Sequence, residues 1–155
     1  MSAVQRLTAL FTHHSARFRP LAAAFGRLHS AVFTRSGGRV GGGWLGAPVL
    51  VLVTNGRRSG KVRETPLIYV RDGEGLALLA ANAGNDRVPA WWLNLQAAPT
   101  AEVVLGGRRR VMRWREVTGE EHARLFAAFV GAYPPTEHYA TFTDRYLPIA
   151  VLTEA

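Results

Sequence analysis

The spacing of apolar residues divides the chain into two parts. Between residues 4 and 32 the apolar positions recur three or four residues apart, which is the period of an amphipathic helix. These positions are Val4, Leu7, Phe11, Phe18, Leu21, Phe25, Leu28 and Val32. Pro20 should kink this helix or start a second one. There is no run of about 18 apolar residues. We therefore expect the helix to pack on the domain or lie on an anionic membrane surface, with an organelle transit peptide as a further alternative.

A Gly-rich linker, residues 36–46, leads into a part of the chain with extended patterning. Runs of β-branched and aromatic residues, separated by short turns rich in Gly and Asp, predict strands. The expected strands are residues 49–53, 65–71, 76–81, 101–105, 108–117 and 147–152. Helices are predicted at residues 90–96 and from Thr118, which should form a capping box with Glu121, to about Tyr133.

In this order of elements hairpin follows hairpin, with helices only at intervals. We therefore expect a mostly β fold with packed helices (α+β), built as an antiparallel barrel or sheet, and not alternating βαβ units. Residues 1–46 would form the N-terminal helical segment and linker. Residues 47–155 would form a single β-rich domain.

Positive charge is concentrated at the start of the chain. The net charge is +8; the first 63 residues hold ten Arg or Lys and no acid, whereas residues 64–155 hold nine against eleven. This asymmetry suggests an anionic partner. The chain has no cysteine, which excludes disulfides and thiolate chemistry and fits a reducing compartment, so we expect a cytoplasmic protein. The five histidines are scattered, and we expect no metal site.

The turn between the first two predicted strands carries four cations within seven residues: Arg57, Arg58, Lys61 and Arg63. We expect several of them to converge, with the backbone amides of Gly56, Ser59 and Gly60, on a single anionic group. The alternative is a solvated loop. A nucleotide phosphate loop is rejected, because only three residues separate its glycines and Val62 stands where Ser or Thr is required.

Residues 82–94, which read NAGNDRVPAWWLN, place a Gly-containing loop before a helix with two adjacent tryptophans. Close backbone donors beside large planar side chains suit an extended aromatic ring. Trp91 and Trp92 could instead belong to the core. However, adjacent helix positions are not expected to face the same core.

Residues 48–155 resemble the deazaflavin-dependent nitroreductase family, whose split β-barrel members bind coenzyme F420. The resemblance rests on stretches in the family's order: GRRSG at 56–60 with Arg63, TPL at 65–67, RDG at 71–73, PAWWLNL at 89–95 with Pro99, TGEE at 118–121, AYP at 132–134, and TDR at 143–145 before IAVL at 149–152. It implies a split β-barrel like that of FMN-binding proteins. The N-terminal helix also resembles the family's, where it covers the cofactor tail or contacts membrane.

The resemblance also implies an activity and a cofactor site. The protein would transfer a hydride from reduced F420 to a small conjugated electrophile such as a quinone, enone or nitro compound. The anionic phospholactate and glutamate tail of the coenzyme would be held by Arg57, Arg58, Ser59, Lys61 and Arg63. The deazaflavin ring would lie along Pro66, Leu67, Ala81, Asn82, Ala83 and Gly84, near Trp91.

Two other readings remain. The barrel could hold FMN or carry a cofactor, or the chain could be a basic module for membrane or nucleic acid. Nucleic acid is disfavoured, because aromatic residues are not interleaved with the basic run. The oligomeric state stays open.

The substrate side departs from the nitro-reducing relatives. Ile68 replaces a tyrosine, Ala81 a serine and Ala83 a glycine, and the tyrosine trio is reduced to Tyr133 and Tyr139 with Thr136. We expect Tyr133 and Tyr139 to be catalytic, stacking on the electrophile and donating a hydroxyl to its oxygen, with Ile68 and Thr136 lining the pocket. The alternative is that both tyrosines only pack. Quinones or enones are expected to react better than nitroimidazoles.

Overall fold

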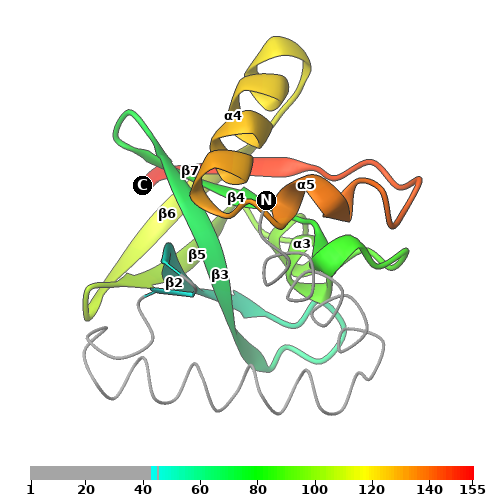
Figure 1. Ribbon diagram of the computed structural model, residues 1–155. Coiled ribbons are helices and arrows are strands. Elements are labelled where there is room, and N and C mark those ends of the chain that lie inside the picture. The colour runs from blue at the N-terminus through cyan, green and yellow to red at the C-terminus, as the bar shows by residue number, and fades with distance from the viewer. Residues whose placement is uncertain (1–42, 45) are drawn as a thin grey trace.

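The computed structural model describes residues 43–44 and 46–155, which form a β-barrel with helices packed on it (Figure 1). The strands of this part are β1 Gly43–Trp44, β2 Ala47–Asn55, β3 Val62–Asp72, β4 Gly75–Leu79, β5 Thr100–Leu105, β6 Arg108–Val117 and β7 Ile149–Glu154. The helical elements are the 3-10 turn η1 Asn82–Gly84 and the helices α3 Ala90–Leu95, α4 Gly119–Ala132 and α5 Thr136–Tyr139. The predicted N-terminal helix and most of the predicted linker lie outside the described residues.

The strands pair antiparallel in the order β1-β2-β3-β4-β7-β6-β5. Strand β5 also pairs with β2, through Val51 with Val104 and Leu52 with Val103, and this pairing closes six strands into a barrel. Closure removes the free strand edges that an open sheet would expose. The expected mostly β fold with packed helices is confirmed. Among the described residues, no helix has the length and apolar character needed to cross a membrane.

The barrel interior is filled by every second residue of the strands, because side chains alternate between the two faces of a strand. Leu50 and Leu52 of β2 point into this interior cluster and are fully buried. Trp91, Trp92 and Leu95 of α3 pack into the same cluster. Helix α3 is therefore fixed to the barrel by its largest side chains.

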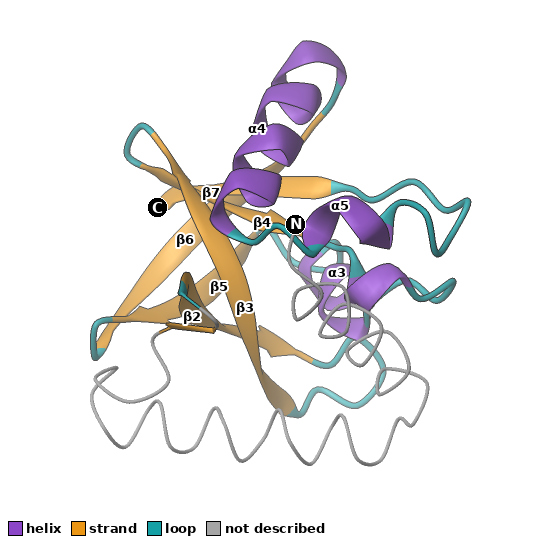
Figure 2. Ribbon diagram, in the orientation of Figure 1, coloured by secondary structure: helices purple, strands orange, loops and turns teal. Residues whose placement is uncertain are grey.

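Helix α4 covers the outer face of the sheet. Leu125 and Phe129 are buried there against Val70, Val117 and Val151, which come from β3, β6 and β7. Helices α3 and α5 and the β2–β3 turn lie together on another side of the barrel, on the right in Figure 2. That side holds most of the predicted site residues.

Two details differ from the sequence-based expectation. Thr118 is the N-cap of α4, but its side chain makes no capping hydrogen bond. Glu121 instead accepts two hydrogen bonds from the guanidinium of Arg115 on β6 (2.6 and 2.9 Å), a bidentate, charge-assisted pair that uses both carboxylate oxygens. The last part of the predicted linker contains a short strand, because residues 43–44 pair with the start of β2.

Candidate active site

The β2–β3 turn, residues 56–61, is held by hydrogen bonds within itself. The amide of Gly56 donates to the carbonyl of Lys61 (2.8 Å), and the amides of Ser59 and Gly60 donate to the carbonyl of Gly56 (3.1 and 2.7 Å). Gly60 has a φ of +66°, which glycine adopts without steric cost. The expectation that these three amides bind an anion is therefore wrong, because their hydrogens are used inside the turn. The side chains of the turn are therefore the main candidates for anion binding here.

The cationic side chains at this turn are those of Arg57, Arg58, Lys61 and Arg63. All four residues are exposed, and within residues 46–155 none of them forms an ion pair with a carboxylate. Ser59 Oγ accepts a hydrogen bond from the Lys61 amide (3.3 Å), so its own hydroxyl hydrogen can still donate. A Cβ on Gly56 would lie 2.6 Å from Ser59 Oγ and 3.7 Å from Arg63 Nε. The missing side chain of Gly56 therefore leaves these donors close together.

Asn94 of α3 connects the turn to the barrel. Its side-chain Oδ1 accepts a hydrogen bond from the backbone amide of Arg57 (3.1 Å), and the residue is buried. This bond fixes the position of the turn relative to α3. No role was predicted for Asn94 from the sequence. The available signal was a polar residue inside the otherwise apolar helix AWWLNL.

The loop after β4 contains three consecutive residues in the left-handed region. Asn82 and Ala83 have φ of +49° and +51°, and Gly84 has +71°. This conformation costs a residue with a Cβ about 1–2 kcal/mol, and such strain clusters at functional sites. The positive φ also explains why a glycine is expected where this chain has Ala83. Gly84 is required sterically, because a Cβ would lie 2.8 Å from the carbonyl oxygen of Tyr139.

Arg145 binds the same loop from the segment between α5 and β7. Its guanidinium donates to the backbone carbonyls of Ala80 (3.1 Å), Ala81 (2.9 Å) and Asn85 (3.3 and 3.4 Å). Burial lowers the pKa of the Arg145 guanidinium, and the charge of Asp86 opposes that shift. Arg145 belongs to the TDR stretch of the family resemblance, but no role was predicted for it from the sequence.

The two predicted catalytic tyrosines meet at the end of α4. The helix ends at Ala132 and α5 begins at Thr136, so the chain turns between the two rings. The ring centroids of Tyr133 and Tyr139 are 6.4 Å apart, with an angle of 44° between the ring planes. The two rings therefore lie close together, and their catalytic role stays a prediction.

Ala81 and both tyrosines belong to one buried cluster, here called the tyrosine cluster, against which Ile68 and Ala83 pack. The phenolic hydroxyl of Tyr133 is buried and has no hydrogen-bond partner within residues 46–155. Buried tyrosine hydroxyls ordinarily have one. Among the described residues, Thr54 Oγ1 and His138 Nε2 are the other buried side-chain nitrogen or oxygen atoms without a hydrogen-bond partner. Thr54 precedes the basic turn, and His138 lies in α5 beside Thr136.

One predicted ring contact, Leu67, lies on the face of β3 opposite to the tyrosine cluster. Leu67 packs against the barrel interior, whereas Ile68 packs against the tyrosine cluster. Pro66 shares its strand face with Ile68, because side chains alternate along a strand. A ring bound beside the tyrosine cluster would therefore touch Leu67 only through its backbone.

Trp91 and Trp92 are both buried in the barrel interior, with ring centroids 5.9 Å apart in an edge-to-face arrangement. The expectation that they could not share one core is wrong. Adjacent helix positions differ by about 100°, and indole side chains are long enough for both to reach the same cluster.

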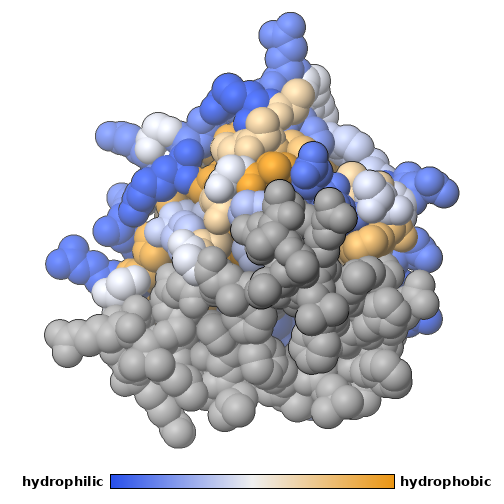
Figure 3. Space-filling model, viewed as in Figure 1, coloured by the Kyte–Doolittle hydropathy of each residue, from blue (hydrophilic) through white to orange (hydrophobic). Residues whose placement is uncertain are grey.

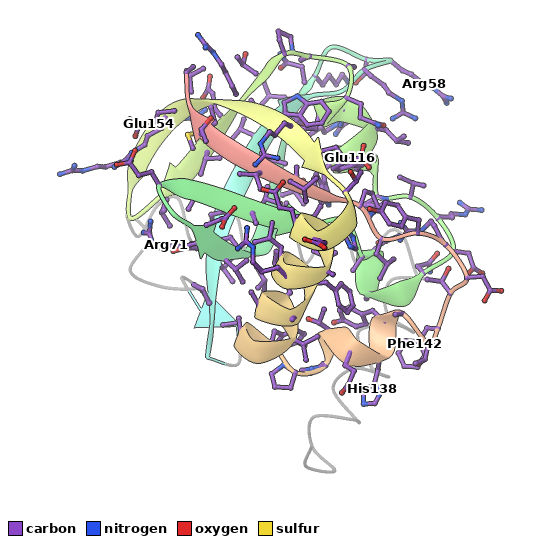
Figure 4. The ribbon with its side chains drawn as sticks, turned by 90° about the horizontal axis from the view of Figure 1, so that it is seen from above. Arg58, Arg71, Glu116, His138, Phe142 and Glu154 are labelled. Carbon is purple, nitrogen blue, oxygen red and sulfur yellow. The ribbon has the colours of Figure 1, made fainter. Side chains whose placement is uncertain are left out.

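The middle of β3 offers surface to a flat ligand. Residues 64–68 are all half-buried, whereas residues 49–54 of the paired strand β2 are all buried. Apolar surface appears among hydrophilic residues on this face of the molecule (Figure 3). Seen from above, Arg58 projects at one edge, well separated from His138 and Phe142 at the end of the molecule that carries α5 (Figure 4). A ligand that contacts both the basic turn and the tyrosine cluster must therefore be elongated.

The fold and this site define a barrel protein suited to a long cofactor with an anionic end. A family model described as F420H(2)-dependent quinone reductase matches residues 25–154. An F420H(2)-dependent quinone reductase of Mycobacterium tuberculosis (strain H37Rv) is 34% identical over 132 residues, which cover 82% of this chain and 88% of that protein. The chain belongs to the F420H(2)-dependent quinone reductase family. It is an oxidoreductase that uses coenzyme F420, as the resemblance implied.

Solved structures agree with this assignment. One described as an F420-H2 dependent reductase, FDR-A, is 35% identical with a TM-score of 0.62, and the match covers 68% of this chain and 93% of that one. Another, described as a domain-swapped dimer, is 32% identical with a TM-score of 0.64, and the match covers 83% of this chain and 97% of that one. The structural likeness thus extends over most of the described barrel.

The residues present fit the F420 cofactor. The basic turn offers four cations that have no carboxylate partner within residues 46–155, which suits an anionic tail. The left-handed backbone at residues 82–84 brings a loop of small residues to the tyrosine cluster. The unpartnered Tyr133 hydroxyl lies in that cluster. These features come from separate segments of the chain and together match a cofactor with a flat ring and a charged tail.

Proposed function

We propose that this protein reduces quinones with F420H2, binding the cofactor tail at the β2–β3 turn and the electrophile beside the tyrosine cluster. When bound, F420 supplies a hydride to the substrate. Arg57, Arg58, Lys61 and Arg63 would hold the phosphate and glutamate groups, with Ser59 donating its hydroxyl hydrogen. The loop of residues 81–84, with Pro66 and the backbone of Leu67, would hold the ring. Trp91 would contribute to cofactor binding indirectly, because its side chain packs in the barrel interior and holds α3 in place.

The observation that carries this proposal is the buried, unpartnered hydroxyl of Tyr133. A quinone oxygen gains negative charge as hydride arrives at the ring. A hydroxyl directed at that oxygen binds the transition state more strongly than the ground state, which accelerates the reaction. Tyr139, with its ring centroid 6.4 Å from that of Tyr133, would stack on the planar electrophile.

Ile68 and Thr136 would complete the pocket wall. Ile68 is apolar and half-buried, and Thr136 is 3% exposed. This wall offers fewer hydroxyl groups than the tyrosines of nitro-reducing relatives. We therefore expect quinones, and to a lesser degree enones, to be reduced faster than nitroimidazoles.

Replacing Tyr133 by Phe tests this function. The substitution keeps the ring and removes only the hydroxyl. With a naphthoquinone and F420H2, turnover should fall by roughly tenfold or more, the value of one hydrogen bond to a developing charge, while the dissociation constant for F420 should change little. Tyr146→Phe is the matched control, because Tyr146 is 53% exposed and its ring stacks on His122. Full turnover in Tyr133→Phe, or faster reduction of a nitroimidazole than of the quinone, would refute the pocket assignment.

The location of the protein and its contacts beyond the substrate also stay predictions. The amphipathic segment of residues 1–34 is expected to cover the cofactor tail or to associate weakly with anionic lipid from the cytoplasmic side. Sedimentation with anionic liposomes, with and without this segment, tests the lipid contact. Equal pelleting of both forms would exclude a role for the segment.

A further inference from the structure

Arg145 uses its whole guanidinium to bind backbone carbonyls. The group has five N–H donors, and five hydrogen bonds are formed: one from Nε, two from Nη1 and two from Nη2. The acceptors are the carbonyl oxygens of Ala80, Ala81, Asn85 and Tyr146. No donor remains for an anionic ligand, so the cation cannot serve as a cofactor-tail ligand in this arrangement.

The bonded carbonyls flank the strained part of the loop. Ala80 and Ala81 precede the left-handed residues Asn82 and Ala83, and Asn85 follows them. A loop that carries this strain keeps its conformation only when surrounding contacts hold both of its ends. The bonds from Arg145 reach both ends, because Nη1 and Nη2 bind the first end while Nε and Nη2 bind the second.

A second contact joins the same loop to the tyrosine segment. A Cβ on Gly84 would lie 2.8 Å from the Tyr139 carbonyl oxygen and 2.9 Å from Phe142 Cβ, so the two backbones touch there. Arg145 itself is held by the bond from its amide to Thr143 Oγ1 (3.1 Å). The segment of residues 139–145 therefore contacts the loop at Gly84, through Tyr139 and Phe142, and at both ends, through Arg145.

We propose that Arg145 is a positioning residue, which holds the loop of residues 81–85 in its ring-binding conformation and at a fixed place relative to Tyr139. The proposal rests on the ring location given under the proposed function. If Arg145 has this role, the affinity for the deazaflavin ring depends on a side chain that does not touch the ring. The β2–β3 turn binds the anionic tail independently of Arg145.

The test compares Arg145→Met, which removes every donor, with Arg145→Lys, which keeps the charge and up to three donors. Arg113→Met is the control, because Arg113 is an exposed arginine on β6. It belongs neither to the loop of residues 81–85 nor to the β2–β3 turn. Two quantities are measured on the full chain. One is amide hydrogen exchange at residues 82–85. The other is the dissociation constant, by fluorescence, for F420 and for the same deazaflavin without its phosphate and glutamate tail.

We expect Arg145→Met to speed exchange at residues 82–85 and to weaken binding of both compounds by the same factor, roughly fivefold or more, the value of about one net hydrogen bond. Arg145→Lys should show a smaller change of the same kind, and it carries the test if the Met variant does not fold. The Arg113→Met control should match the wild type. A purely structural role would lower the unfolding temperature without weakening binding of the tail-less compound by the folded protein, and that result would overturn the proposal.

Ala83→Asn separates failure of this proposal from failure of the ring location. Asparagine tolerates the left-handed backbone but adds bulk and polarity where the ring is proposed to lie. If Ala83→Asn weakens binding of the tail-less compound and the Arg145 variants do not, the Arg145 proposal is wrong and the ring location stands. If neither variant weakens it, the ring location is wrong and the Arg145 proposal falls with it.

Discussion

Arginines gather in two regions of this barrel and are treated differently in each. At the β5–β6 hairpin, Arg109 pairs with Glu102 (2.6 Å) and Arg110 with Glu154 (2.6 Å). At the β2–β3 turn, no cation has a carboxylate partner within residues 46–155. The two regions look alike in sequence, as GRRR at 107–110 and GRRSGK at 56–61. They differ in how far the fold supplies counter-charges: within residues 46–155, two of the three hairpin arginines have a carboxylate partner, but none of the turn cations does.

The difference indicates which cluster is available to a ligand. A cation already paired with a carboxylate gains little from a second anion, because binding must first disrupt or share the existing pair. Unpaired cations that repel one another release that repulsion when an anion binds. The density of positive charge in the sequence therefore does not identify the cofactor-tail site. The missing counter-charges do.

The largest effect is expected for the double variant Arg57→Ala/Arg58→Ala. Each charge-assisted contact to the cofactor tail should contribute roughly 1.5–3 kcal/mol. The dissociation constant for F420 should therefore rise at least about tenfold, and the difference should be greatest at low salt. The matched variant is Arg109→Ala/Arg110→Ala, which removes the same charge from the paired region. Equal weakening by both double variants would mean that net charge, and not the turn, binds the tail.

A smaller effect is expected for Asn94→Ala, which removes the acceptor for the Arg57 amide. One net hydrogen bond is worth about 1 kcal/mol, so F420 should bind roughly fivefold more weakly. Because no charge changes, this loss should not depend on salt. Asn94→Asp keeps the acceptor but adds a negative charge beside the turn, so its loss should shrink as salt rises. Titration of both variants at two salt concentrations decides between these outcomes.

The smallest effect is expected for the ion pair between Arg115 and Glu121, and it concerns stability rather than binding. The hydrogen bonds from Arg115 hold the pKa of the Glu121 carboxyl below its ordinary value. A carboxyl whose pKa is lower in the folded state stabilises the fold above its unfolded-state pKa, and the contribution is lost as pH falls through its folded-state pKa. Glu121→Gln should therefore lose slightly less unfolding free energy than the wild type between neutral and acid pH.

Urea unfolding at several pH values measures this difference, and F420 titration of the same variant is its control. Affinity for F420 should be unchanged, since neither Arg115 nor Glu121 lies in the β2–β3 turn or the tyrosine cluster. A variant as acid-sensitive as the wild type would show that this pair does not contribute to acid unfolding.

Much of the fold was predictable, because local sequence patterns determine where its strands and helices lie. The strand at residues 108–117 was predicted with its observed bounds, and the helix after Thr118 within a residue or so, since period-2 and period-3.6 patterning depends only on neighbouring positions. The basic turn was also predictable, because it depends on a single short segment. Membership of the F420-dependent family followed from several short stretches taken in order.

Other features were decided by tertiary structure. Which arginines find a carboxylate depends on strand register: Arg110 meets Glu154 because β6 pairs with β7, across 44 positions of sequence. The role of Arg145 depends on a loop more than sixty residues earlier reaching its guanidinium. The amides of the β2–β3 turn were misassigned because the sequence does not show that the turn satisfies its own donors. Local patterning determined the elements, while pairing between distant segments decided which charges and hydrogen-bonding groups stayed free to bind a ligand.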